Sequence, residues 1–362
     1  MKRRHFIAGT AGAAAAAIAA PALAQTPTVR WRMVTSWPKS LDTLQGSAVA
    51  MAERISQITE GKFQVQVFAA GEIVPALGVF DATSNGTVEC SHTLSTYFFG
   101  RNPAIGFQGG MPFGLNTRQQ QAWMFAGGGR ELMRDIFAKY NIVAMPCGNV
   151  GVQMGGWFRK EVNSLDDLRG LKFRIGGVGG TVLSKLGVVP QQIAAGDIYT
   201  SLERGTIDAA EWVGPYDDEK LGFVKVARYY YTPGWWEGSG EISTFVNTGK
   251  WAELPPAFKA AYEAAASEQC VQMMAHYDAK NPEALRRLVA AGAQLRAFPR
   301  PVLDACYKAT IETLDDIASK NDEFKKVYDS WKKFTDESNL WFRIAENTLD
   351  QFRFAAPNWV KA

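Results

Sequence analysis

The sequence predicts an α/β protein with two lobes and a ligand cleft between them. Three observations lead to this prediction. Strand, helix and strand patterns occur in two successive stretches, polar residues cluster where the predicted strands end, and the chain from Leu254 onward is mostly helical in pattern. The length of 362 residues suits two domains. The sequence holds no internal repeat or low-complexity segment that would indicate a solenoid or a disordered tail.

The first residues, MKRRHFIAGTAGAAAAAIAAPALAQ, have the pattern of an export signal. They combine a basic start, an alanine-rich apolar core and small residues at Ala22 and Ala24. Arg3 and Arg4, followed by Phe6, resemble a twin-arginine signal, which directs the export of folded proteins. We therefore expect residues 1–24 to be removed and the mature protein to lie in the bacterial periplasm.

Charge and hydropathy exclude two classes of function. The formal net charge is +3, and Lys2, Arg3 and Arg4 of the signal carry three positive charges, so the mature side chains are neutral overall. A neutral chain lacks the positive surface of nucleic-acid binders. After the signal, no stretch approaches the roughly 18 uninterrupted apolar residues of a membrane helix. We expect a soluble mature protein that binds no nucleic acid.

Histidine and cysteine are scarce. After the signal only His92 and His276 remain, which nearly excludes a histidine-rich zinc site. The cysteines are widely separated and form neither a paired metal motif nor a redox CxxC motif. They are Cys90, Cys147, Cys270 and Cys306. We expect buried free thiols, or at most one or two disulfides.

The first lobe begins with a strand, VRWRMVTSW. Residues 41–59 then carry apolar side chains at helical spacing and stop at Gly61, and residues 62–73 alternate as a second strand. A short helix, a turn at residues 85–86 and a third strand follow. The loop after this strand holds Ser95, Thr96 and Tyr97. Because open sheets bind ligands at the carboxyl ends of their strands, we expect this loop to reach the cleft.

The second lobe begins with a predicted strand over residues 150–157. A turn at residues 163–164 and a short acidic helix start lead to a strand that contains Arg174. The pattern then predicts a helix, a strand, a helix that ends at Gly205 and a last strand. These elements cover residues 181–186, 189–193, 198–204 and 206–212.

Arg174 stands at the end of its strand, just before the glycine-rich sequence GGVGG. Its apolar neighbours Phe173 and Ile175 alternate with it, so its side chain lies on the opposite face of the strand. Such an arginine can also extend along an outer sheet face with its head in water.

Other polar or aromatic residues occupy similar positions at strand ends and in turns rich in glycine and tryptophan. They are Gln153, Glu211, Trp212 and Glu237. Each has an ordinary alternative, because an amide caps turns and an acid in a loop is commonly exposed or paired at the surface. Together with Arg174 they form the candidate set for one pocket.

Two stretches resemble a known family. SLDDLRGLKFRIGG and LGVVPQQIAAGDIYTSLERGTIDAAEW resemble the central signature of the DctP-type substrate-binding proteins of tripartite ATP-independent periplasmic (TRAP) transporters, and the similarity extends over nearly all of the mature chain. The resemblance implies a periplasmic-binding-protein fold of the class II type and a receptor that works with TRAP membrane subunits rather than an enzyme. It also implies that Arg174 grips the carboxylate of an organic acid, because a guanidinium offers two parallel donors.

Charge balance then predicts a cation. Arg174 and the carboxylate of a bound monocarboxylate ligand cancel each other's charge. Glu211 and Glu237 would then leave two uncompensated negative charges in a closed cleft. Both glutamates, the amide oxygen of Gln153 and a backbone carbonyl near Trp212 form an all-oxygen set that suits a hard ion. This set resembles the family branch that binds alpha-keto acids, such as pyruvate, with sodium; calcium is the alternative ion.

Aromatic residues in the same loops predict apolar walls for a short alkyl chain. They are Trp37, Tyr97, Phe158, Trp212, Trp235 and Trp236. Trp235 and Trp236 cannot both face the ligand if their segment is extended. We expect Trp212 and Tyr97 to contact the ligand before the others, with Gln153, Thr96, Trp37 and Phe158 completing the substrate contacts.

The pattern also predicts how the chain divides. Residues 25–150 with 239–285 form one lobe, 151–238 with 286–330 the other, and 331–362 a helical extension. Thr335 is a candidate cap for a helix whose apolar face would run to Pro357. This face carries Leu340, Trp341, Ile344, Ala345, Leu349 and Phe352. It packs either on its own lobe or on a second subunit, and the second alternative predicts a homodimer.

A nucleotide-binding oxidoreductase is the alternative function. Gly177 and Gly179 lie between a strand and a helix, and Asp197 follows about twenty residues later. The match fails at the third glycine position, which is occupied by Val182. A serine hydrolase is weaker still, because the sequence contains no GxSxG motif.

Overall fold

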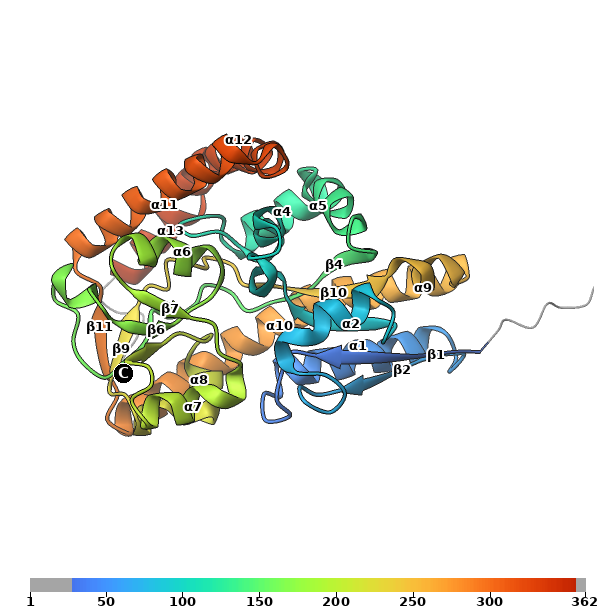
Figure 1. Cartoon of the computed structure of the whole chain (residues 1–362), viewed down its shortest axis with the longest axis horizontal. Coiled ribbons are helices and arrows are strands. Elements are labelled where there is room, and N and C mark those ends of the chain that lie inside the picture. The colour runs from blue at the N-terminus through green and yellow to red at the C-terminus, as the bar shows by residue number, and fades with distance from the viewer. Residues whose placement is uncertain (1–27, 356–362) are drawn as a thin grey trace, which may run out of the picture.

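The computed structural model describes residues 28–355 and contains two β-sheets flanked by helices (Figure 1). The first sheet has the order β2 (Phe63–Phe68), β1 (Val29–Thr35), β3 (Cys90–Leu94), β10 (Glu241–Asn247) and β4 (Ile142–Asn149). The second has the order β11 (Gln294–Ala297), β9 (Tyr229–Thr232), β5 (Gly156–Phe158), β8 (Ala209–Ala210), β6 (Lys172–Arg174) and β7 (Val189–Gln191). The predicted two-lobed α/β fold is confirmed.

Helices cover both sheets. In chain order they are α1 (Leu44–Ile58), α2 (Val79–Ser84), α3 (Gly106–Gly109), α4 (Thr117–Ala126), α5 (Gly129–Ala138), α6 (Gly177–Lys185), α7 (Ala195–Glu203), α8 (Pro215–Leu221), α9 (Thr248–Glu253), α10 (Pro256–Ala290), α11 (Arg300–Lys320), α12 (Asp322–Ile344) and α13 (Glu346–Ala355). A 3₁₀ helix at Ser95–Phe98 replaces the predicted loop after β3. The helical region expected from Leu254 onward is present, with β11 inserted between α10 and α11.

The first sheet packs on α1 and α10. Strand β1 turns Trp31 and Met33 into an apolar cluster, where the Trp31 ring meets the edges of Phe63 at 4.9 Å and Tyr262 at 5.8 Å between ring centroids. Met51 of α1 is buried in the same cluster. Burial of each such side chain contributes about 1.5 to 3 kcal/mol, so this cluster holds the strand ends in fixed positions.

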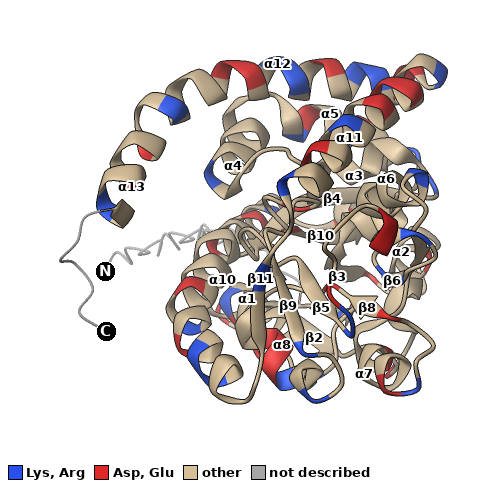
Figure 2. Cartoon of the chain, turned by 90° about the vertical axis from the view of Figure 1, so that its left-hand side faces the viewer, with Lys and Arg blue, Asp and Glu red and all other residues tan. Residues whose placement is uncertain are grey.

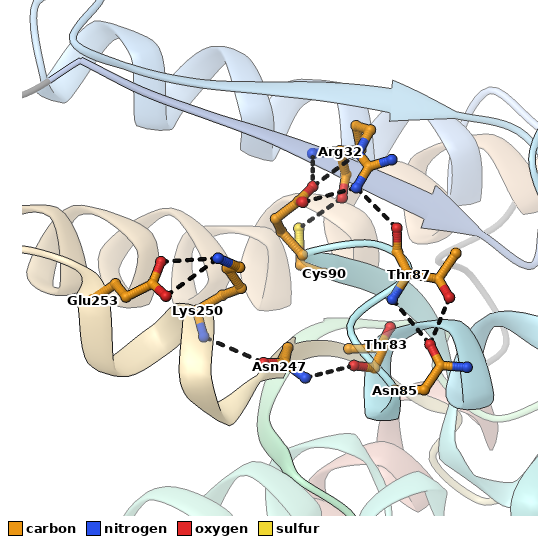
Figure 3. Close-up of polar contacts among 9 residues, drawn as sticks. Arg32, Thr83, Asn85, Thr87, Cys90, Asn247, Lys250 and Glu253 are labelled. Carbon is orange, nitrogen blue, oxygen red and sulfur yellow. Dashed lines mark hydrogen bonds and ion pairs between the residues drawn. The ribbon is translucent and has the colours of Figure 1, made fainter.

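Polar contacts fix the turn that precedes β3 (Figure 3). Arg32 of β1 forms an ion pair of 2.9 Å with Glu89 and donates a hydrogen bond of 2.8 Å to the carbonyl of Thr87. The Asn247 side chain donates to the carbonyl of Thr83 at 3.0 Å and accepts from the backbone of Gly249 at 3.0 Å, which caps α9. These contacts tie β1 and β10 to the segment that leads into β3.

Helix α10 runs along both sheets, as Figure 1 shows for the long orange helix across the centre. Phe258 and Tyr262 near its start pack in the cluster of the first sheet. Tyr277 and Leu288 near its end pack with residues of the second sheet. One helix of 35 residues therefore connects both halves of the molecule.

Predicted elements of the second lobe differ in extent from the structure; the last strand, expected over residues 206–212, covers only Ala209–Ala210. Of the strand expected over residues 150–157, only the last two residues belong to a strand, β5, and the chain before it turns at Gly151, which adopts a φ angle of 78°. The chain from Gly151 to Gly156 crosses from the first sheet to the second, with Gln153 bridged to Gly234. The helix expected at residue 181 begins already at Gly177.

The C-terminal helices differ from the prediction at their start. Thr335 lies inside α12, where its hydroxyl donates to the carbonyl of Trp331 at 2.7 Å, so it is not a cap. Asn321 caps α12 by accepting from the backbone of Phe324 at 2.9 Å. The first half of α12 packs on the body of the molecule, and Figure 2 shows α13 extending away from it. Pro357 lies outside the described residues.

All four cysteines are buried free thiols, as the first of the two sequence alternatives predicts. Within residues 28–355, no helix is both long and apolar enough to span a bilayer. The predicted export signal lies outside the described residues.

Candidate ligand site between the two sheets

Strand ends from both sheets converge on one cavity. Thr96 and Tyr97 follow β3, Arg174 ends β6, and Glu211 and Trp212 follow β8. Trp37, Gln153 and Glu237 also line the cavity, from the segments after β1, before β5 and before β10. The structure therefore brings together residues that are as far as about 200 positions apart in the chain, as the carboxyl-end rule for open sheets predicts.

Arg174 is buried, with 3% of its surface exposed. Its Nε atom donates to the carbonyl of Ile193 at 3.0 Å, and Nη1 donates to the carbonyl of Glu211 at 2.8 Å. Nη1 also forms an ion pair with the carboxylate of Glu211. Arg174 therefore has a side-chain partner within the protein, in addition to the carboxylate that the family resemblance implies. The hydrogen bonds from Arg174 to Ile193 and Glu211 use Nε and Nη1, so Nη2 remains for an anion in the cavity, beside the hydroxyl of Tyr97.

Aromatic contacts hold the guanidinium in place. Its carbon atom lies 5.0 Å from the ring centroid of Trp212, a cation–π distance. Trp37 meets Trp212 edge to face at 6.3 Å between centroids, and the Trp37 indole donates to Nδ1 of His92 at 2.8 Å. Burial lowers the pKa of His92 to about 4, so the ring is neutral at pH 7 and accepts this bond.

Sequence reasoning missed the role of His92 in this arrangement. A single buried histidine in a strand resembles an ordinary core residue, and its only signal was its rarity in the mature chain. His276, the other one, lies on the outer groove between α1 and α10.

Two glutamates face the same cavity. Burial raises the pKa of Glu211 to about 7, against the opposing effect of Arg174. Burial and the nearby charge of Glu211 raise the pKa of Glu237 to about 8. Thr96 donates to Glu237 at 3.2 Å, and the Gln153 amide nitrogen donates to its other oxygen. Two carboxyl groups with raised pKa values in one closed cavity indicate missing positive charge.

The oxygen atoms present fit a hard cation. Oε1 of Gln153 is buried and has no hydrogen-bond partner within residues 28–355. In that part of the chain no three His, Cys, Asp or Glu side chains group closely enough to hold a metal ion. A cation here would therefore use the two carboxylates of Glu211 and Glu237 together with amide and backbone oxygens, a set typical of sodium or calcium.

Phe158 does not line the cavity, contrary to the prediction. Both faces of the short strand β5 are covered, and the Phe158 ring packs against Tyr231 at 4.8 Å and Phe173 at 5.2 Å. Trp235 stacks on Phe113 at 5.0 Å outside the cavity, while Trp236 lines it. The apolar wall also includes aliphatic residues that sequence reasoning did not single out. Among them are Leu44, Leu94, Val150 and Ile242.

Close packing explains the glycine-rich segment after Arg174. A Cβ atom at Gly177 would lie 3.3 Å from Thr96, and one at Gly179 would lie 2.8 Å from the Cβ atom of Trp236. These glycines thus make room for side chains and backbone of the cavity wall. Their presence needs no bound nucleotide, which was the basis of the oxidoreductase alternative.

The sequence matches a known family over most of its length. Residues 33–321 match the model of bacterial extracellular solute-binding protein family 7, DctP. A curated relative is the monocarboxylate 2-oxoacid-binding periplasmic protein all3028 of Nostoc sp. strain PCC 7120. It is 46% identical over 361 residues, which cover 97% of this chain and 99% of the relative.

Solved structures of similar proteins contain ligands and cations. A TRAP transporter solute-binding protein from Bordetella bronchiseptica is 59% identical, with a TM-score of 0.90 over 91% of this chain and 98% of that one. It is described as a dimer of mixed occupancy, with copurified calcium and picolinate in one active site and an apo second site.

Two further solute-binding proteins of this type are each 35% identical, with TM-scores of 0.87 over 90% of this chain. The one from Pseudoalteromonas atlantica, 99% of which is covered, contains sodium and pyruvate. The one from Colwellia psychrerythraea, 100% of which is covered, contains calcium and pyruvate.

Proposed function

Because the chain belongs to the DctP family of bacterial extracellular solute-binding proteins, we propose that it is a periplasmic receptor for a short 2-oxo monocarboxylate such as pyruvate. The receptor binds the acid together with a cation and delivers it to TRAP membrane subunits for uptake. The role is one of binding and release and includes no catalytic step.

One observation carries this proposal. Arg174, a buried arginine whose bonds to the protein backbone use Nε and Nη1, lies in the same cavity as the buried Glu211, the partly buried Glu237 and the unpaired amide oxygen of Gln153. Such a set matches an anion and a cation bound side by side. A neutral sugar would leave the glutamates uncompensated, and a lone anion would add to their charge.

Different residues of the cavity contact different parts of the ligand in this proposal. Nη2 of Arg174 donates to a ligand carboxylate, and Trp212 keeps the guanidinium plane in position for that bond. Tyr97 and Trp37 close one side of the cavity, and Leu94 and Ile242 supply an apolar surface for a short alkyl chain. Because this apolar surface closes around the cavity, it favours an acid with few carbon atoms beyond the carboxylate and keto groups.

Four groups would hold the cation: the carboxylates of Glu211 and Glu237, the amide oxygen of Gln153 and the backbone carbonyl of Trp212. When bound, the cation neutralises the two glutamates and attracts the ligand's oxygens. Sodium is our primary assignment and calcium the alternative, since the related proteins contain either ion. Thr96 and Gln153 keep Glu237 oriented by donating to its two oxygens.

We assign residues 25–150 with 239–285 to one lobe and 151–238 with 286–330 to the other. The lobes close around the ligand, which couples binding to stability. The segment that carries Glu237 joins β9 of the second sheet to β10 of the first. A ligand that engages Glu237 therefore acts on a connection between the lobes.

The C-terminal helices support a homodimer. Leu340, Trp341 and Ile344 at the end of α12 are 65%, 61% and 70% exposed, and Leu349 and Phe352 of α13 are exposed as well. They do not pack on their own lobe, which was the other alternative. An exposed apolar stripe of this length marks an interaction surface, and the related Bordetella protein is described as a dimer.

Protein purified without denaturation tests the assignment. Mass spectrometry and elemental analysis should find a short 2-oxo acid and sodium or calcium. Added pyruvate should raise the melting temperature, and nicotinamide nucleotides should not. Equal stabilisation by sugars, amino acids and pyruvate would contradict the proposal.

A further inference from the structure

Two adjacent aspartates, Asp217 and Asp218, lie behind the cavity in the first turn of α8. Their exposed fractions are 0% and 1%, and neither lines the cavity. A buried carboxylate needs partners, so the contacts of each one indicate what it supports.

Asp218 supports the second sheet. Its Oδ2 atom accepts from the hydroxyl of Tyr230 at 2.7 Å and from the indole of Trp157 at 3.0 Å, and its Oδ1 atom accepts from the backbone of Val213 at 3.4 Å. Tyr230 and Trp157 are stacked residues of β9 and β5. Asp218 thus attaches α8 to the core of the sheet.

Only one of the two carboxylate oxygens of Asp217 has a hydrogen-bond partner in the described part of the chain. Its Oδ2 atom accepts from the hydroxyl of Tyr277 on α10 at 2.7 Å. Its Oδ1 atom is buried without a hydrogen-bond partner in the described part of the chain, and the same holds for the indole nitrogen of Trp212. Trp212 packs in the same apolar cluster as Tyr277, the residue that bonds Asp217, so the Trp212 side chain lies next to this carboxyl group. Burial raises the pKa of Asp217 to about 6, and Tyr277, Lys220 and the Trp212 indole oppose this rise.

Trp212 contacts and supports Arg174, the arginine proposed to bind the ligand carboxylate. Its ring lies 5.0 Å from the guanidinium carbon of Arg174 and 6.3 Å from the ring of Trp37. A tilt of this ring would move the surface that supports Arg174. An unpaired donor on Trp212 beside an unpaired acceptor on Asp217 is the arrangement that one hydrogen bond would complete.

We propose that Asp217 is a positioning residue for the ligand site: it accepts the Trp212 indole N–H and so orients the ring under Arg174. Tyr277 holds the carboxylate of Asp217 in place from α10. The inference rests on the proposed function, because its consequence is ligand affinity. It assigns a task to a carboxylate that touches neither the ligand nor the cation.

A double-mutant cycle tests the proposal on the full mature chain. Asp217→Leu, Asp217→Asn and Trp212→Phe are titrated with pyruvate by calorimetry in sodium, and again in calcium. Asp217→Leu removes the acceptor at similar volume and should weaken pyruvate binding about tenfold. In the Trp212→Phe background, which has no indole donor, it should weaken binding less than about twofold. Asp217→Asn keeps an acceptor and should recover most of the affinity.

Asp218→Asn is the matched control, since Asp218 is equally buried but bonds within the sheet. It should lower the melting temperature and show no coupling to Trp212→Phe in pyruvate affinity. Equal weakening by Asp217→Leu in both backgrounds, or none in either, would overturn the inference.

Near-ultraviolet circular dichroism of the ligand-free protein separates this inference from the proposed function. The difference between wild type and Trp212→Phe reports the Trp212 environment. Asp217→Leu should change that signal and Asp217→Asn should preserve it. If wild type fails to bind pyruvate, the proposed function fails, and this spectrum still decides the positioning role: an unchanged signal in Asp217→Leu would refute it.

Discussion

The carboxylate of Asp42 accepts a hydrogen bond of 2.9 Å from the hydroxyl of Tyr216. Asp42 precedes α1 beside the first sheet, and Tyr216 belongs to α8 beside the second. Lys220 of α8 forms an ion pair with the same carboxylate. The contact therefore joins elements of the two lobes, and opening of the cleft would break it.

Asp42→Asn should raise the ligand dissociation rate by up to about fivefold, because a partly exposed ion pair contributes at most about 1 kcal/mol. Stopped-flow release of pyruvate measures the rate. Glu72→Gln is the matched control, since Glu72 pairs with Lys39 at 2.6 Å and both residues precede α2 in the first lobe. Equal rates for wild type and Asp42→Asn would show that the contact does not hold the cleft closed.

Arg174→Lys should weaken ligand binding by about 3 kcal/mol, which is roughly a hundredfold. Lysine keeps the charge and loses the fork that bonds Ile193, Glu211 and the ligand at once. Calorimetry gives the affinity, and a melting curve shows whether the variant is folded. Wild-type affinity in the folded variant would mean that the ligand carboxylate binds elsewhere.

Glu237→Gln should relax the dependence of binding on sodium or calcium, because it removes one uncompensated carboxylate from the cavity. Glu211→Gln should relax the cation dependence or abolish binding, because the Glu211 carboxylate is also buried in the cavity and is part of the proposed cation site. Titrations of each variant across cation concentrations measure the dependence. Unchanged cation dependence in both variants would remove these glutamates from the cation site.

His92 should contribute a loss of stability as the pH is lowered from about 6.5 to about 4. Its pKa is 6.5 ordinarily and about 4 when folded, so the unfolded chain takes up a proton first. The loss from this one residue amounts to about 3 kcal/mol, whereas the buried carboxyl groups with raised pKa values, such as Glu211 and Glu237, change the stability in the opposite direction. Urea denaturation at several pH values isolates the histidine: relative to wild type, the unfolding free energy of His92→Gln should gain about 3 kcal/mol between pH 6.5 and pH 4. Parallel curves for the two proteins would contradict this assignment.

Removal of the residues after Phe334 should convert a dimer to a monomer that still binds ligand. Sedimentation of both chains at micromolar concentration measures this outcome. The exposed side chains of α13 and the end of α12 supply the interface, while the cavity lies among residues 37–242. A full-length monomer would exclude the homodimer, and a dimeric shortened chain would place its interface elsewhere.

The position of Arg174 could be predicted because strand alternation and the following glycines are local features. The exclusion of Phe158 could not, since whether a strand is covered on one face or both depends on distant residues such as Tyr231 and Phe298. The glycines after Arg174 suggested a turn, but close packing of Gly179 against Trp236 places them in a helix. The link from Trp37 to His92 crosses between neighbouring strands and leaves no local pattern.

Calorimetric titration of pyruvate into the wild-type protein, stripped of ions by a chelator, tests the central claim most directly. The titration is repeated after addition of sodium and, separately, of calcium. We predict little binding without either ion and one pyruvate per chain with at least one of them. Full affinity in the ion-free sample would remove the cation from the account, and absence of binding in all three samples would contradict the assignment as a 2-oxo acid receptor.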